Sequence, residues 1–348
     1  PLKIFQSVFV YRYETKATRP LFRMREFLWN EAHTVHRSWD EAEKQVNEAI
    51  KIYDELFKRL GLAYYILRRP EFDKFAGAVY SIAFDAWNPD GRINQIGTVH
   101  NLGENFSRAF NITYEDPSGK QRYAYQTCYG FGISRTLAAI ISQHGDDHGL
   151  VLLPEIAPIQ IVIVPIPYKG FEDKIGDYAR EVHERLRSAG FRTYLDETDR
   201  TPGEKYYCWE MFGVPVRVEI GPRDLEKRHI TICERVNLQR IAVPLDDAVK
   251  AIEDVFMRIA EELRKRSLST LKEMTVNAED MNSLKEAIKS RKIARICWCG
   301  STECAERIAE ESGGEIRGYR IDIEEKPEHP CIVCGERAER VVYVARAY

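Results

Sequence analysis

The chain has 348 residues, with 51 lysines and arginines against 54 aspartates and glutamates, and a formal net charge of −3. This balance argues against a protein that coats nucleic acid through bulk charge, although it leaves room for local basic patches. At this length we expect two or three domains of roughly 100 to 150 residues. We find no apolar run long enough to span a bilayer and no secretory signal, so the sequence predicts a cytoplasmic protein that does not act in a membrane.

The first region, residues 1–157, has the pattern of an antiparallel sheet with helices. A capping box at Ser38 and Glu41 opens a helix that Gly61 should end. A further helix of small residues is predicted after GFGISR. Strands are predicted over residues 3–12, 76–84, 93–103 and 121–135.

After prolines at 154 and 158 the rhythm changes to alternating strand and helix. We expect residues 158–266 to form a compact α/β domain whose last helix runs from Asp246 to about Arg266. A helical stretch over 268–290 then leads into the rest of the third region, 267–348. The fold class expected is therefore α/β and α+β in several domains.

Cysteines cluster near the end of the chain, where five of the eight follow position 296. Two pairs separated by a loop are Cys299 with Cys304 and Cys331 with Cys334. This spacing suits a structural zinc ion with four thiolate ligands and no open position. Two disulfides or free thiols are the weaker alternative, since the chain shows no export signal. Cys297 and His329 could compete as ligands, but Cys297 should sit on a strand and point away from Cys299.

The stretch RYE at 12–14 and the arginines after it predict an anion site. Arg12 and Glu14 should face the same side of one strand, with Arg23 on its neighbour. Two guanidiniums and a carboxylate over a sheet suit a nucleotide, because arginine grips phosphate bidentately and glutamate accepts from an exocyclic amine. The alternative is a surface ion-pair ladder on an edge strand.

Two later segments carry further candidates. Gln95, Thr98 and His100 project from one short strand, and GFGISR places Arg135 at the entry to a helix. Glycines there permit close approach of a ligand, although a lone GxG is a weak signal. Taken singly, each of these residues is more often structural than functional.

Together these segments resemble a known family. RYE followed by TRPLFRMREFLWNEAHTVH resembles motif 2 of the class II aminoacyl-tRNA synthetases, in the prolyl form. INQIGTVHNLGENFSRAF and GFGISRTLAAIISQHGDDHGLVLLPEIAP resemble that family's substrate strand and motif 3. The likeness continues through TPGEKYYCWEMFGVPVRVEIGPRDL, the four cysteines and the final VVYVARAY. It covers essentially the whole chain and points to the archaeal and eukaryote-like branch, which carries the zinc-bearing tail.

The resemblance implies a nucleotide site. Arg12 would hold the α-phosphate of ATP, Glu14 the adenine or its neighbourhood, and Arg23 the distal phosphates. Arg135 would lie near the γ-phosphate and share the catalytic role with Arg12, while Gln95 could help to place Mg²⁺. The ATP-binding residues implied are Arg12, Glu14, Arg23, Gln95, Thr98 and Arg135.

It also implies a substrate pocket and a reaction. Arg12, Trp29 and His100 would bind L-proline, which reacts with ATP to give prolyl-adenylate and is then transferred to the 3′ end of tRNA(Pro). Neither step needs a protein nucleophile, because positioning and charge neutralisation carry the rate. The cofactors expected are Mg²⁺ with ATP and a structural Zn²⁺.

In this family motif 1 and the loop that binds proline's amino group precede motif 2, and neither is found in these residues. We therefore expect an incomplete catalytic core, and a homodimer when the N-terminal segment is present. A bacterial-type editing insertion is also missing between Trp29 and Thr98. The alternatives are a threonyl or glycyl synthetase, and a tRNA-binding paralogue that does not aminoacylate.

For the middle domain the resemblance implies anticodon binding. Glu219, Arg223 and Asp224 lie at a strand end in EIGPRDL and could read the edges of unpaired bases. A solvated charged turn is an equally good interpretation of each residue alone. In this branch the terminal tyrosine, here Tyr348, tends to lie near the active site.

Overall fold

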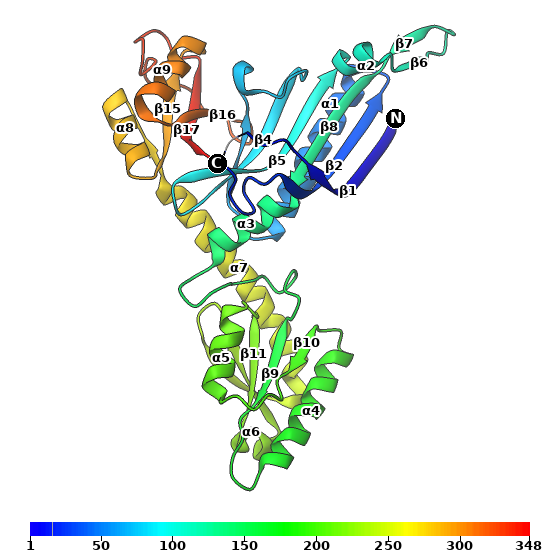
Figure 1. Cartoon of the computed structure of the whole chain (residues 1–348), viewed down its shortest axis with the longest axis vertical. Helices are drawn as coiled ribbons and strands as arrows, with labels where there is room; N and C mark the ends of the chain where they lie inside the picture. The colour runs from blue at the N-terminus through cyan, green and yellow to red at the C-terminus, as the bar shows by residue number, and fades with distance from the viewer. Residues whose placement is uncertain (16) are drawn as a thin grey trace. The chain divides into compact units, whose positions relative to one another are not determined.

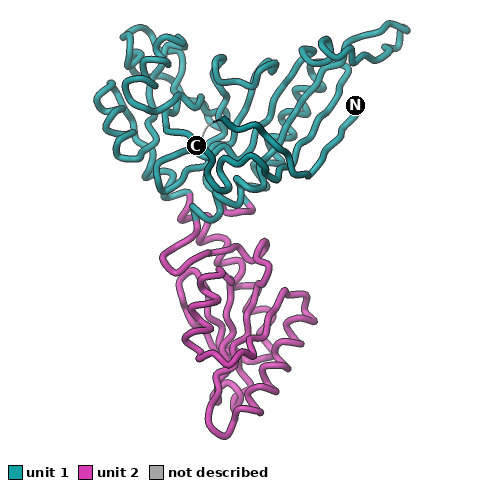
Figure 2. The backbone as a smooth tube through the Cα atoms, viewed as in Figure 1, with its two compact units in different colours: residues 1–58, 62–143, 268–348 teal, residues 59–61, 144–267 magenta. Residues whose placement is uncertain are grey.

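The computed structural model describes residues 1–15 and 17–348 and contains two compact units (Figures 1 and 2). The first unit comprises residues 1–58, 62–143 and 268–348, and the second comprises 59–61 and 144–267. Residues near the two ends of the chain therefore fold together in the first unit. Among the described residues, no helix combines the length and the apolar character that crossing a bilayer requires.

The first unit is built on a sheet of ten strands in the order β1-β2-β8-β5-β4-β3-β16-β17-β15-β14. Most neighbours are antiparallel, and the parallel pairs are β14 with β15 and β17 with β5. The strands are β1 (Leu2–Tyr11), β2 (Glu26–His36), β3 (Tyr64–Arg68), β4 (Tyr80–Trp87), β5 (Arg92–Gly103), β8 (Tyr125–Gly132), β14 (Thr275–Asn277), β15 (Ile293–Trp298), β16 (Glu315–Arg320) and β17 (Arg340–Ala347). A separate hairpin pairs β6 (Thr113–Glu115) with β7 (Gln121–Tyr123).

Helices cover this sheet and connect its strands. They are α1 (Trp39–Arg59), α2 (Asn105–Phe110), α3 (Ile133–His144), α8 (Met281–Lys289), α9 (Thr302–Ser312) and the short 3₁₀ turn Glu71–Asp73. The apolar face of α1 presents Tyr53 and Phe57, whose rings contact those of Phe84 and Phe131 edge-on. Phe131 of β8 points towards α1, and side chains alternate along a strand. Gly130 and Gly132 therefore belong to the face of β8 that points away from α1. That face carries the site described below.

The second unit has a five-stranded sheet in the order β10-β9-β11-β12-β13. Strands β10, β9 and β11 are parallel, while β12 and β13 are antiparallel to their neighbours. Its elements are β9 (Ile161–Pro165), α4 (Glu172–Ser188), β10 (Thr193–Leu195), α5 (Pro202–Met211), β11 (Val216–Ile220), α6 (Pro222–Lys227), β12 (His229–Glu234), β13 (Arg240–Pro244), a 3₁₀ turn (Leu245–Asp247) and most of α7 (Ala248–Met274). Both sheets confirm the mixed fold class expected from the sequence.

The long helix α7 differs from the prediction, because it continues past Arg266 to Met274. Neither glycine nor proline interrupts it, and the β-branched pair Thr275 and Val276 starts β14. The stretch 268–290 is thus the end of one helix, a short strand and a second helix. Strands β16, β17, β15 and β14 also extend the sheet of the first region beyond β3.

Candidate active site

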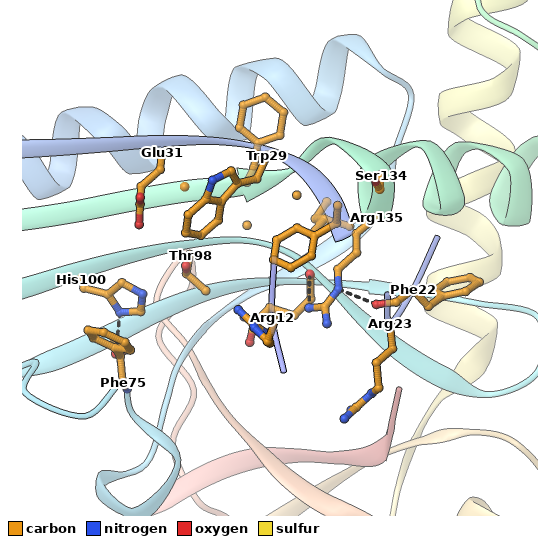
Figure 3. Close-up of a pocket in the computed structure, with 18 of the residues that line it drawn as sticks. Arg12, Phe22, Arg23, Trp29, Glu31, Phe75, Thr98, His100, Ser134 and Arg135 are labelled. Atoms are coloured by element: carbon orange, nitrogen blue, oxygen red, sulfur yellow. Dashed lines mark hydrogen bonds between the residues drawn. The ribbon is translucent and has the colours of Figure 1, made fainter. Parts of the chain in front are cut away.

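A cavity of about 460 Å³ lies in the first unit (Figure 3). We call it the pocket. Its walls come from the β1–β2 connection, the open face of β2, β5 and β8, the segment after β3 and the start of α3. All eight residues predicted for ATP and proline line it, namely Arg12, Glu14, Arg23, Trp29, Gln95, Thr98, His100 and Arg135.

Cross-strand register sets the floor of the pocket. Glu31 on β2 faces Gly130 on β8, which in turn faces Thr98 on β5. A Cβ atom at Gly130 would lie 2.8 Å from the backbone oxygen of Asn30, so a larger residue is excluded there. The glycine therefore leaves room between the two strands that carry Glu31 and Thr98.

A bulge in β5 explains how Gln95 and Thr98 can both line the pocket. Residues three apart on a regular strand face opposite sides of a sheet. Here Asp85 pairs with Gln95 and Phe84 with Gly97, which leaves Ile96 as the extra residue. This extra residue shifts the alternation by one position, so that both polar side chains point to one side.

The arginine-rich stretch from Arg12 to Arg25 connects β1 to β2, whereas the sequence predicted that it would form two paired strands. Strand β1 ends at Tyr11 and β2 starts at Glu26. Arg12 and Glu14 follow the first strand directly, and Arg23 lies beyond the turn at Pro20. The backbone N–H of Arg12 still donates to the oxygen of Arg25 at 2.7 Å, and Arg23 pairs with Glu14 at 3.5 Å between Nη1 and Oε1. The predicted residues converge, but a loop holds them.

Positive charge gathers at this end of the pocket. Arg135, at the start of α3, donates from Nε to the oxygen of Phe22 at 2.8 Å and from Nη1 to the oxygen of Gln95 at 3.3 Å (Figure 3). Burial lowers the pKa of Arg135, and the neighbouring cations Arg12 and Arg23 lower it further. Three guanidiniums this close suit an anion with several charges.

The opposite end of the pocket is more apolar. His100 contacts the ring of Phe75 at 5.0 Å between centroids and the Oγ of Ser81 at 2.8 Å from Nδ1. Burial, with a smaller contribution from Arg69, lowers the pKa of His100 to about 4, so its imidazole is neutral near pH 7. Among the described residues, the indole Nε1 of Trp29 is buried without a hydrogen-bond partner. This end therefore offers a compact ring-lined space with one unsatisfied donor.

Sequence reasoning missed several lining residues. Glu31 shares a face with Trp29 two positions earlier, so alternation along the strand could have indicated it. Its carboxylate lies 3.5 Å from the Nε2 of His33, and the Sγ of Cys128 lies 3.8 Å from both groups. Arg69 and Phe75 come from the segment after β3, where no sequence pattern marked a site.

The four predicted cysteines of the C-terminal region come together. Their sulfurs all lie within 4.8 Å of one another, with 3.7 Å between Cys299 and Cys334. Zn–S bonds of about 2.3 Å in a tetrahedron give S···S distances of roughly 3.8 Å, so the set fits zinc. Cys297 lies on β15 and is not part of this group. His329 is also outside the group and approaches Glu279. The disulfide alternative is not supported, because all eight cysteines are free.

The three residues proposed for the anticodon occupy different environments in the second unit. Glu219 is buried and accepts hydrogen bonds from Arg217 at 3.0 Å and Arg240 at 3.2 Å. Asp224 accepts from the N–H of Gly221 at the start of α6 at 2.9 Å. Only Arg223 is exposed. Reading of bases by these residues stays a prediction, with the geometry favouring a structural role for Glu219 and Asp224.

Tyr348 lies beside the pocket, as expected from the resemblance. Its ring stacks on that of Phe22 at 4.0 Å between centroids, and its hydroxyl donates to Asp90 at 2.7 Å. Arg23 donates to the backbone oxygen of Tyr348. The last strand therefore reaches the loop that carries the arginines.

Three family models match consecutive parts of the chain. The tRNA synthetase class II core domain (G, H, P, S and T) matches residues 1–144, the anticodon binding domain matches 160–255, and the C-terminal domain of prolyl-tRNA synthetase matches 281–348. The chain is also similar to the proline–tRNA ligase of Methanosarcina mazei, with 46% identity over all of this chain and 72% of that protein. It is 45% identical to the proline–tRNA ligase of Thermococcus kodakarensis, over all of this chain and 73% of that protein.

Solved structures agree with these relationships. Prolyl-tRNA synthetase from Cryptosporidium parvum, in complex with halofuginone and AMPPNP, matches with a TM-score of 0.95 and 30% identity, over all of this chain and 74% of that one. The same protein with L-proline and AMP matches with a TM-score of 0.92 and 31% identity, over all of this chain and 75% of that one. The chain thus belongs to the proline–tRNA ligase family of class II tRNA synthetases.

Proposed function

We propose that the chain performs the reaction of its family, the two-step attachment of L-proline to tRNA(Pro). The observation that carries this proposal is that one pocket is lined by three neighbouring arginines and also by Trp29 and His100. One end suits the phosphates of ATP and the other suits a small ring. The relatives named above are proline–tRNA ligases, and one solved relative was determined with L-proline and AMP.

In the first step the carboxylate of proline attacks the α-phosphorus of ATP, and pyrophosphate leaves. We assign Arg12 to the α-phosphate, Arg23 to the distal phosphates and Arg135 to the far side near the γ-phosphate. Glu14 would contact the adenine or its neighbourhood. The developing charge on the phosphoryl oxygens is then met by fixed guanidiniums, which is the main way such transfers are accelerated.

The nucleotide is expected to bring Mg²⁺, which neutralises phosphate charge when bound. We assign Gln95 and Thr98 to the nucleotide, with Gln95 helping to place the ion. At the other end, Trp29 and His100 would flank the pyrrolidine ring. A neutral His100 suits this place, because an imidazolium would repel the ammonium group of proline.

In the second step the 3′-terminal ribose hydroxyl of tRNA(Pro) attacks the activated carbonyl of prolyl-adenylate, and AMP leaves. We retain the division proposed from the sequence, with the catalytic core at 1–157, the anticodon-binding domain at 158–266 and the linker with the zinc domain at 267–348. Zn²⁺ bound by Cys299, Cys304, Cys331 and Cys334 would be structural, since the set fills all four positions of a tetrahedral site. We also propose that the protein forms homodimers and acts in the cytoplasm.

The test is ATP–pyrophosphate exchange with each of the twenty amino acids, on the longest form of the protein that its source expresses. Exchange that depends on proline alone supports the enzyme and its substrate together. Absence of exchange, with tRNA(Pro) still bound, would favour the paralogue that binds tRNA without aminoacylation. Exchange with threonine or glycine would identify another member of the class.

A further inference from the structure

A buried ion network joins the C-terminal region to the wall of the pocket. Its centre is Asp85 on β4, which is fully buried. Arg69 grips both oxygens of this carboxylate, at 2.9 Å from Nη1 and 2.8 Å from Nη2. Arg317 on β16 adds a third hydrogen bond, from Nε to Oδ2 at 3.2 Å. Two segments separated by more than two hundred positions therefore share one buried carboxylate.

The same network reaches a residue that we assign to the nucleotide. Arg69 also donates from Nη2 to the Oε1 of Gln95 at 2.7 Å. The backbone oxygen of Gln95 accepts from Arg135 at 3.3 Å, so Gln95 is held through both its side chain and its backbone. Gln95, Arg69 and Asp73 all line the pocket.

Local backbone geometry directs Arg317 inward. The pairing of β16 with β17 is irregular between Ile316 and Gly318, so that Arg317 is the extra residue of a β-bulge. Gly318 has a φ of 129°, and a Cβ atom there would lie 2.2 Å from the oxygen of Arg68. The bulge thus brings β16 close to the end of β3, where Arg69 follows. The backbone oxygen of Arg317 itself accepts a hydrogen bond from Arg69.

The network is also connected to the cysteine cluster. Cys304 lies on α9, and the buried side chains Ile308 of α9 and Ile316 of β16 belong to one apolar core together with Cys304 and Cys331. The position of Arg317 is therefore tied to the packing around the cysteines.

We propose that Arg317 is a positioning residue for the nucleotide end of the pocket, acting through Asp85 and Arg69 on the side chain of Gln95. The inference rests on the proposed function, because it concerns binding of ATP. A buried carboxylate shared by two guanidiniums has few alternative arrangements, since each charge that loses its partner stays desolvated. The C-terminal region thereby fixes one wall of the site where ATP binds.

The test compares Arg317→Lys and Arg317→Gln in proline-dependent ATP–pyrophosphate exchange. Lysine keeps the positive charge near Asp85 but loses the planar donor group, so this variant should fold even where Arg317→Gln does not. Contacting residues in one network commonly couple strongly enough to change a binding constant about tenfold. We expect the KM for ATP to rise about tenfold in Arg317→Gln and less in Arg317→Lys, with the KM for proline within about twofold of wild type.

A double-mutant cycle with Gln95→Ala separates positioning from general damage. If Arg317 acts through Gln95, then Arg317→Lys should add little to the KM for ATP once Gln95 is alanine. Arg320→Gln is the matched control, because Arg320 lies on the same strand but pairs with Asp322 and lies outside the network. It should leave both KM values unchanged.

A normal KM for ATP in Arg317→Lys would overturn the proposal, as would equal increases in both KM values or a full effect in the Gln95→Ala background. Failure of the wild-type protein to exchange would instead count against the proposed function. The two ideas can therefore be judged separately.

Discussion

Replacing Arg12 with alanine tests the charge arrangement of the pocket with little disturbance to the fold. Arg12 is exposed, lies just beyond the end of β1 and places its guanidinium 5.2 Å from the centroid of the Phe27 ring. Its backbone hydrogen bond to Arg25 does not depend on the side chain. The free energy of unfolding should therefore change by about 1 kcal/mol or less, the value of an exposed cation–π contact.

The effect on catalysis should be much larger. Loss of one preorganised electrostatic contact to a developing oxyanion typically costs 10²- to 10³-fold in rate, or about 2.7–4 kcal/mol. Arg23 and Arg135 remain in the pocket, so some adenylation should persist. Arg12→Lys keeps the charge but cannot form two parallel hydrogen bonds, so its loss should be about tenfold.

The assay is proline-dependent ATP–pyrophosphate exchange, with thermal unfolding measured in parallel. Arg25→Ala is the control, because Arg25 is exposed in the same connection and does not line the pocket. A loss under about tenfold in Arg12→Ala would refute the assignment to the α-phosphate. A similar loss in Arg25→Ala would show that the assay reports damage to the loop and not a specific contact.

Three further predictions concern other parts of the chain. Metal analysis should find one zinc per chain, and Cys334→Ser should lower the melting temperature by about 5 °C or more; a metal-free protein with an unchanged melting temperature would contradict this. His100 should bind a proton only near pH 4 in the folded protein but near pH 6.5 in the unfolded chain. The free energy of unfolding should therefore fall as the pH drops from about 6.5 towards 4, and it should fall by more than in His100→Gln. An equal dependence of stability on pH in the two proteins would contradict the lowered pKa of His100. Arg223→Glu should raise the KM for tRNA(Pro) about tenfold and leave proline-dependent exchange unchanged. A higher KM together with slower exchange would mark Arg223 as structural.

Local patterns were sufficient to predict much of this molecule. The spacing of the cysteines predicted their meeting, because each pair of ligands lies within six residues of the sequence. The helix after Ser38 and the alternation of strand and helix beyond Pro158 also follow from neighbouring residues. The individual roles proposed for the pocket residues came from resemblance, since no single pair of them is distinctive.

What the sequence could not predict depends on contacts between distant segments. The bulge at Ile96 has no marker in its own residues, yet it decides which side chains of β5 share a face. The addition of β16 to β3 places Arg317 beside Asp85, a pairing that neither segment indicates alone. For Glu219 the resemblance implied a role in reading bases, which stays a prediction. Its buried ion pair with Arg217, two positions earlier on the same strand, is a contact that the sequence pattern did not indicate.

The pocket also holds its charges in an arrangement that favours binding over stability. Burial and the charges of Arg12 and Arg23 both lower the pKa of Arg135, which means that the folded protein keeps this guanidinium charged at a cost. A polyphosphate would reverse that repulsion, because each cation would gain a nearby anion. Sites of this kind commonly trade local stability for function. The buried network of Asp85, Arg69 and Arg317 differs from this arrangement, because its charges are paired within the protein. It can therefore stabilise the pocket wall whether or not a ligand is bound to the arginines.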